Sequence, residues 1–200
     1  MKKSPLFWFI LALVAVAGFA ALGPAEKSLG VNVRVVYVHG AWVWASLASF
    51  LAAALVGLAG LILRRERLNA WSRALGRTGL FFWITYLPIS MWAMQTNWNG
   101  LFLAEPRWRL ALVFAITGLL LQVGVALLGD PAWASAVNIG YFVVLMISVT
   151  NAQNVMHPPA PILNSDAWRI QLFFAVLLGF TLLAAVQFAR WLYQFEHVDS

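Results

Sequence analysis

Residues 41–63 read AWVWASLASFLAAALVGLAGLIL, and none of these 23 residues carries a charge. A helix needs about 20 apolar residues to cross the roughly 30 Å hydrocarbon core of a bilayer. A lone segment in lipid satisfies its own backbone hydrogen bonds only as an α-helix. We therefore predict that residues 41–63 form a membrane-spanning helix.

Five further apolar runs have lengths compatible with spanning helices. They are residues 6–22, 79–94, 110–128, 132–150 and 170–189. The run at 79–94 is short and contains Pro88, which should kink it, while Thr85 or Ser90 could satisfy the freed carbonyl. The predicted fold is an all-α integral membrane protein, in which residues 1–200 form one domain of six transmembrane helices.

The first run also has features of a secretory signal peptide. Lys2 and Lys3 precede it, and the small-residue segment Gly23-Pro24-Ala25 follows it. The apolar core of a signal peptide, however, has only about 7–15 residues, which this run exceeds. We therefore favour a retained span.

The composition excludes an ordinary soluble protein. Hydrophobic residues make up 62% of the chain and charged residues 10%, against roughly 45–50% and about 25% in soluble domains. The absence of cysteine excludes disulfides, cysteine-ligated zinc or iron–sulfur sites and covalent c-type heme attachment. No G-x-x-x-x-G-K-[ST] loop for nucleotide phosphates is present. The net charge of +6 is typical of nucleic-acid binding, but the positions of the charges favour membrane topology, so we expect no nucleic-acid partner.

Lysine and arginine predict the orientation, because cytoplasmic loops carry the excess of these residues. With six spans both termini share a side, which holds eight of them: Lys2, Lys3, Arg64, Arg65, Arg67, Arg73, Arg77 and Arg190. The other side holds five: Lys27, Arg34, Arg107, Arg109 and Arg169. We therefore predict that both termini and residues 64–78 and 129–131 are cytoplasmic, and that residues 23–40, 95–109 and 151–169 face outward.

Residues 64–78 have a pattern of their own. Leu68, Trp71 and Leu75 share one helical face, and arginines lie on another. This pattern predicts a short helix that lies in the membrane interface beside anionic headgroups. We favour a topology anchor there over a docking site for a cytoplasmic partner.

Two of the three histidines are candidate ligands. His197 lies in the charged C-terminal tail and is expected to be solvated. His39 directly precedes the span at 41–63, with Gly40 beside it and Trp42 on the same helical face. His157 lies in a loop that three prolines stiffen. Both boundaries face outward, so two neutral imidazoles at similar depth could serve as axial ligands of heme iron.

Two other interpretations of these histidines remain open. Each could be an interfacial residue that bonds to headgroups or backbone. A zinc site would need further ligands, and the predicted outer surface offers only Glu26, Glu105 and Asp166 as carboxylates. Zinc is therefore the weaker metal interpretation.

The outer segment at residues 95–109 is aromatic and apolar, yet it carries several polar groups. These are Asn97, Asn99, Glu105, Arg107 and Arg109. Its apolar residues could form a shelf for a flat hydrophobic ligand, and its arginines could pair with the carboxylates of that ligand. The alternative is an aromatic belt with flanking positive charge, as many membrane proteins have.

Together the three outer segments resemble the heme-handling membrane proteins of cytochrome c biogenesis, and most closely the heme exporter protein C (CcmC) family. The resemblance rests on Tyr37-Val38-His39 before the second span, on the Trp-containing loop between spans three and four, and on His157 between spans five and six. It covers roughly residues 30–190 and includes the number and orientation of the spans.

The loop departs from the family pattern, which reads approximately W-G-x-W-W-V-W-D-x-R-L. Residues 98–108 here read W-N-G-L-F-L-A-E-P-R-W. Trp98 and Arg107 match the pattern, Glu105 replaces the aspartate, and Phe102 replaces a tryptophan. Leucine and alanine replace two more tryptophans. The resemblance implies heme held by the two outer histidines on a platform formed by this loop, and delivery to a periplasmic heme chaperone in company with ABC-transporter subunits.

The leading hypothesis is a non-enzymatic protein of cytochrome c maturation in the inner (plasma) membrane, which holds heme b at the outer membrane surface and hands it on. We expect His39 and His157 to ligate the iron. Three aromatic residues would pack on the porphyrin, namely Trp42, Trp98 and Phe102. Arg107 and Arg109 would pair with the propionates, and Glu105 would support Arg107. Met156 adjoins His157 and could compete with it as a thioether ligand.

Two other classes of function are carried as alternatives. A membrane b-type cytochrome would share the bis-histidine ligation, although it usually buries heme between helices, and the predicted spans contain no internal histidine. A structural subunit of a larger membrane complex would bind no ligand.

Overall fold

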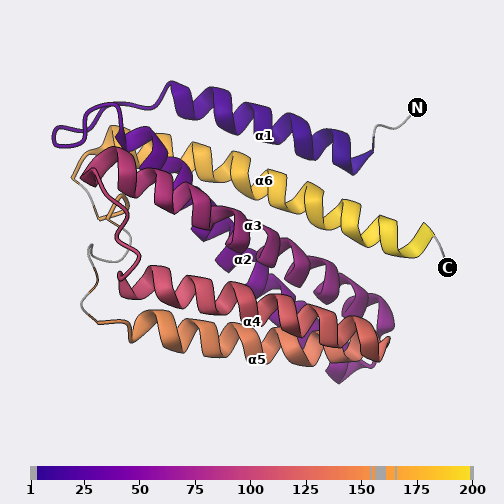
Figure 1. The fold of residues 1–200 in the computed structure, drawn as a ribbon. Helices are drawn as coiled ribbons and strands as arrows, with labels where there is room; N and C mark the ends of the chain where they lie inside the picture. The colour runs from indigo at the N-terminus through magenta and orange to yellow at the C-terminus, as the bar shows by residue number, and fades with distance from the viewer. Residues whose placement is uncertain (1–3, 154, 156–160, 165, 199–200) are drawn as a thin grey trace.

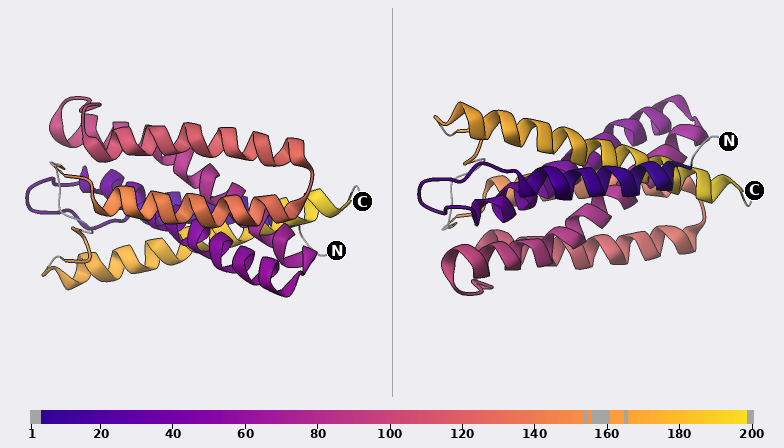
Figure 2. Two further views of the ribbon diagram at one scale, coloured as in Figure 1. Left: turned by 90° about the horizontal axis from the view of Figure 1, so that it is seen from below. Right: turned by 90° about the horizontal axis from the view of Figure 1, so that it is seen from above.

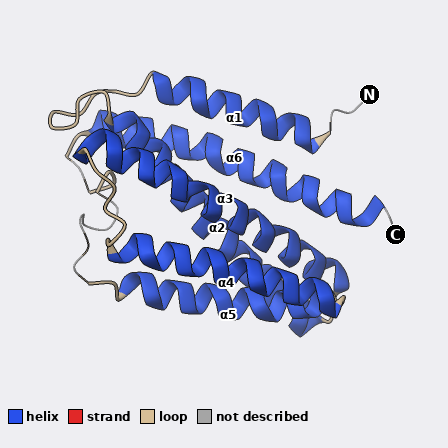
Figure 3. Cartoon of the chain, in the orientation of Figure 1, coloured by secondary structure: helices blue, strands red, loops and turns tan. Residues whose placement is uncertain are grey.

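The computed structural model describes residues 4–153, 155, 161–164 and 166–198. Helices account for 82% of the described residues, and no strand is found among them (Figure 3). These residues form six helices: α1 (Pro5–Ala21), α2 (Val33–Leu63), α3 (Glu66–Trp98), α4 (Pro106–Leu128), α5 (Pro131–Thr150) and α6 (Trp168–Val198). The all-α prediction is confirmed.

The helices are arranged in three layers (Figure 1). α2 and α3 cross the middle of the bundle, α1 and α6 lie on one side of this pair, and α4 and α5 lie on the other. The three longer connections gather at one end, which we call the loop end (Figure 2). The two tight turns, the start of α1 and the end of α6 lie at the opposite end, which we call the turn end.

Three helices begin with the same local signal. Ser4, Glu105 and Asp130 each accept a hydrogen bond from a backbone N–H of the first turn, and each is followed by proline. An oxygen-bearing side chain satisfies a backbone donor that has no partner inside the helix. Proline in the first turn loses no helical hydrogen bond. These residues fix where α1, α4 and α5 start.

In the described part of the chain, four helices are long and apolar enough to cross a membrane, namely α2, α4, α5 and α6. α1 is apolar but has only 17 residues, and α3 carries charged residues in its first half. Large apolar side chains also face outward, for example Ile62, Leu120 and Leu127, which are 70%, 67% and 84% exposed. A helix bundle with such a surface is expected in lipid rather than in water. The helices therefore indicate a membrane-embedded protein.

The first half of α3 corrects one prediction. Residues 64–78 do not form a separate interfacial helix, because only Arg64 and Arg65 form the turn and the rest continues into α3. This part of α3 packs closely on its neighbours. A Cβ atom at Gly60 would clash with Asn69, and one at Gly76 would clash with Asn138. Small residues at helix crossings permit such close approach in membrane proteins.

Hydrogen bonds between helices explain why the polar residues of this segment lie inside the bundle. Ser135 donates to Oδ1 of Asn69 at 2.8 Å, and Asn138 donates to the carbonyl and the hydroxyl of Ser72 at 2.8 and 3.0 Å. Ser72 in turn donates to the carbonyl of Ala53 at 2.8 Å. We call Asn69, Ser72, Ser135 and Asn138 the polar layer. It joins α2, α3 and α5 near the turn end.

Besides α3, helices α2 and α6 extend well beyond the predicted spans. α2 begins at Val33 rather than near residue 41, so His39 lies within the helix. The backbone of α6 continues to Val198 and includes His197, which was expected in a solvated tail.

The predicted role of Thr85 beside Pro88 is wrong. Pro88 lies inside α3, where it leaves the carbonyl of Ile84 without its usual helical donor. The hydroxyl of Thr85 donates instead to the carbonyl of Phe81 at 2.7 Å, one turn earlier.

Candidate functional site

His39 lies in the second turn of α2, near the loop end, and is half-buried. Its ring is 5.5 Å from the ring of Tyr86 on α3, at an interplanar angle of 54°. Tyr86 is 6% exposed and packs edge-on against Trp83 at 5.1 Å. The imidazole is therefore placed between helices by a buried aromatic pair.

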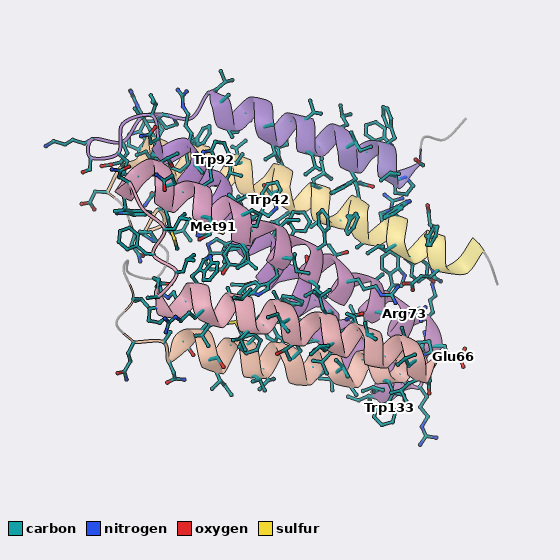
Figure 4. All side chains as sticks on the ribbon, viewed as in Figure 1. Trp42, Glu66, Arg73, Met91, Trp92 and Trp133 are labelled. Atoms are coloured by element: carbon teal, nitrogen blue, oxygen red, sulfur yellow. The ribbon has the colours of Figure 1, made fainter. Side chains whose placement is uncertain are left out.

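Trp42 follows one turn after His39 and points into the interface between α2 and α3. Its indole N–H donates to the hydroxyl of Thr85 at 3.1 Å, and its ring lies 5.4 Å from that of Phe82. The side chain is half-buried near the middle of the bundle (Figure 4). Trp42 therefore contributes to the packing of α2 against α3.

The connection between α3 and α4 exposes apolar side chains. Trp98 is the last residue of α3 and is 42% exposed, and the helix ends there because Asn99 adopts a left-handed conformation with φ of 53°. Leu101, Phe102 and Leu103 are 48%, 41% and 42% exposed. These side chains form an apolar surface at the loop end, as a platform or an interfacial belt requires.

Glu105 is buried at the start of α4, with 8% of its surface exposed. Its Oε2 accepts a hydrogen bond from the backbone N–H of Trp108 at 2.6 Å, which caps the helix. Its Oε1 is buried and accepts no hydrogen bond from the described residues. The carboxylate also interacts electrostatically with Tyr86. Tyr86 of α3 is thus in contact with the ring of His39 on α2 and within electrostatic range of Glu105 on α4.

Two further buried polar atoms at the loop end have no hydrogen-bond partner within the described part of the chain. They are the indole nitrogen of Trp108 and Oδ1 of Asn97. Most buried polar groups in folded proteins are paired, so a buried group without a protein partner is one that a water, an ion or a ligand can satisfy. Together with Oε1 of Glu105 they supply one donor and two acceptors.

The predicted arginines lie at the same end. Arg107 is half-buried in the first turn of α4. Arg109 is exposed, and its Nε donates to the carbonyl of Leu103 at 3.3 Å. That bond ties the start of α4 to the exposed apolar surface of the preceding connection.

His157 and Met156 lie outside the described residues, but the end of their loop is described. A Cβ atom at Gly40 would lie 3.2 Å from Phe174 of α6 and 3.6 Å from Cδ1 of Ile162. The space that the sequence predicts beside His39 is thus filled by α6 and by the loop between α5 and α6. His157 precedes Ile162 by five residues in the sequence, and five residues span at most about 18 Å.

Glu26, one of the carboxylates considered for zinc, is engaged within its own turn. Its Oε2 accepts hydrogen bonds from the backbone N–H groups of Leu29 and Ser28, at 2.9 and 2.8 Å. These bonds, first that from Leu29 and then that from Ser28, hold the pKa of Glu26 below its ordinary value. Within the described ranges, no three His, Asp or Glu side chains are grouped to hold a metal ion.

Sequence reasoning did not identify Tyr86 or Trp108 as members of this region. One signal was available for Tyr86, because a phenol within an apolar span has to find a polar environment. Trp108 follows Glu105 by three residues, which is the spacing of a helix cap and its first-turn donor.

Comparisons with protein-family models, curated proteins and solved structures find no match to this chain.

Proposed function

We propose that this chain is a heme-binding membrane protein of cytochrome c maturation. In this proposal all six helices span the inner (plasma) membrane and both termini are cytoplasmic, as the excess of lysine and arginine at the turn end supports. The loop end faces outward and holds heme b for a heme chaperone, in company with other cytochrome c maturation or ABC-transporter subunits. The protein positions and releases its ligand without making or breaking covalent bonds.

The observation that carries the proposal is the placement of His39. Its imidazole is half-buried at the loop end, and the next residue, Gly40, faces Ile162 of the loop that bears His157. Neutral imidazole is a common axial ligand of heme iron. Tyr86, which packs on the ring of His39, could help to fix its orientation.

The donor set is chemically suited to heme. Trp98 and Phe102 offer exposed aromatic surface to a porphyrin, whereas Trp42, bonded to Thr85, could contribute only the part of its ring that faces away from α3. Arg107 and Arg109 could pair with propionates through charge-assisted hydrogen bonds. Bound heme would supply an iron centre that imidazole nitrogen can ligate. The chain's own residues would bind it, exclude water from it and set its affinity.

Electron transfer by a membrane b-type cytochrome is the second candidate. One observation favours it: His39 lies inside α2 and packs on Tyr86 of α3, rather than preceding the helix. A helix-borne histidine between two helices is typical of cytochromes that bury heme within the bundle.

Two assays on the purified protein separate these functions. The protein, made with ample heme, should show a heme absorption spectrum and should transfer its heme to an apo-acceptor in solution within minutes. Rapid reduction by a quinol without such transfer would favour the cytochrome. Protein that contains no heme under these conditions would contradict both and favour a structural subunit.

A further inference from the structure

The turn end carries an ionic cluster that heme binding does not involve. Glu196 near the end of α6 accepts hydrogen bonds from Arg73 and Arg77 of α3, with Nη2 of Arg73 at 2.7 Å from Oε2. The side chain of Glu196 is 11% exposed, and those of the arginines are 21% and 32% exposed. Two cations share one carboxylate, so the cluster keeps one uncompensated positive charge.

This cluster lies close to the level at which the helices would leave the membrane. Nε of Arg77 donates to Oε1 of Gln122 on α4 at 3.4 Å, and Gln122 is six residues before the end of α4 at Leu128, or about 9 Å along the axis. α4 is about 35 Å long, against a hydrocarbon core of about 30 Å. Trp133, exposed in the first turn of α5, marks the same boundary (Figure 4).

Further positive charge surrounds the cluster. Exposed arginines at the turn end are Arg64, Arg65, Arg67 and Arg190, whereas the exposed acidic residues described there are Glu66 and Asp130. Charged groups at this depth are desolvated in part, so an uncompensated guanidinium binds an anion more strongly there than in water. The anion present at this level of a bilayer is the lipid phosphate.

We propose that Arg73 and Arg77 form the headgroup site for an anionic phospholipid of the inner leaflet. Glu196 holds both guanidinium groups in place and leaves them with one net positive charge. Basic pockets between membrane helices on the cytoplasmic side bind anionic headgroups in this way. The proposal requires membrane insertion but does not depend on heme.

Native mass spectrometry of the full chain in a non-ionic detergent tests the proposal. The protein is offered equal amounts of dioleoyl-phosphatidylglycerol and dioleoyl-phosphatidylcholine, which share acyl chains and phosphate but differ in net charge. We expect about tenfold more phosphatidylglycerol than phosphatidylcholine adducts, as charge-assisted hydrogen bonds would give. Glu196→Gln should increase this preference, because it removes the competing carboxylate. A gain of selective binding cannot arise from misfolding.

Two multiple variants complete the test. Arg73→Gln/Arg77→Gln/Glu196→Gln leaves no buried charge alone and should bind both lipids equally. Arg64→Gln/Arg65→Gln removes more net positive charge from the exposed turn and should keep most of the preference. The proposal is wrong if the triple variant retains the preference, if Glu196→Gln lowers it, or if the turn variant abolishes it. Displacement of the lipid by millimolar inorganic phosphate would also contradict it, since the site would then bind free anions.

Discussion

Buried polar groups are paired at the turn end of the bundle, whereas several at the loop end have no hydrogen-bond partner among the described residues. At the turn end the polar layer and the Arg73–Glu196 pair find partners on neighbouring helices. At the loop end Oε1 of Glu105, Nε1 of Trp108 and Oδ1 of Asn97 have none among the described residues. An unpaired buried polar group costs about 1–3 kcal/mol. The comparison indicates that the turn end holds the helices together, whereas the loop end keeps buried polar groups that the proposed ligand could pair with.

The largest expected effect tests close packing at the turn end. Gly76→Ala should lower the free energy of unfolding by about 1–3 kcal/mol, as overpacking does, because the new methyl group would meet Asn138. Gly124→Ala is the matched control, since its methyl group would meet open space. Thermal unfolding in detergent, followed by circular dichroism, measures both. Equal effects in the two variants would mean that the polar layer is not tightly packed.

Two glutamates allow the ends to be compared by the same chemical change. Glu196→Gln should destabilise the fold by about 1–2 kcal/mol, because both arginines lose a charged acceptor that is only partly screened by solvent. Glu105→Gln should change the free energy of unfolding of the heme-free protein by less than about 0.5 kcal/mol, since an amide oxygen can still cap α4. If Glu105→Gln lowered the free energy of unfolding more than Glu196→Gln did, the comparison between the two ends would be wrong.

At the loop end, substitutions should affect the ligand more than the fold. Trp98→Ala and Arg107→Ala should each weaken heme retention about tenfold, with little change in melting temperature of the heme-free protein. Heme titration followed by absorbance measures the affinity. Trp92→Ala is a useful control, because Trp92 is 59% exposed one to two turns away from the connection. Wild-type heme affinity in both variants would mean that the connection between α3 and α4 is only an interfacial belt.

The smallest effect concerns a single interhelical hydrogen-bond pair. Asn138→Ala removes the bonds from α5 to Ser72 of α3, and such bonds contribute on average about 0.6 kcal/mol in membrane proteins. Double-mutant cycles with Ser72→Ala should show that the two effects are not additive. Full additivity would indicate that these side chains do not interact.

Much of the fold could be predicted from hydropathy, because apolar runs long enough to span a bilayer leave helices as the only solution. The first half of α3 could not. Its Asn69 and Ser72 are polar enough to indicate an interfacial segment, and only their partners on α2 and α5 explain why they are buried. Arg73 and Arg77 were expected among lipid headgroups, but their acceptor Glu196 lies more than a hundred residues later in the chain.

For the candidate site, the residue types could be named from the sequence, but their depth in the bundle could not. His39 was expected just before a helix, but α2 in fact starts at Val33. After Arg34 no charged residue or proline interrupts the apolar sequence, so the helix includes His39. Tyr86 was not identified, because contact between α2 and α3 depends on the crossing of two helices rather than on residue spacing. His157 remains a prediction, since it lies outside the described residues.

The most direct test of the central claim compares single histidine variants by absorption spectroscopy. The oxidised wild-type protein should show six-coordinate, low-spin heme, and acidification should release the heme because protonated imidazole has no lone pair for iron. His39→Ala and His157→Ala should each give five-coordinate heme or lose heme, whereas His197→Ala, at the turn end, should match the wild type. Wild-type spectra and heme content in both His39→Ala and His157→Ala would contradict the claim that the loop end is a heme site.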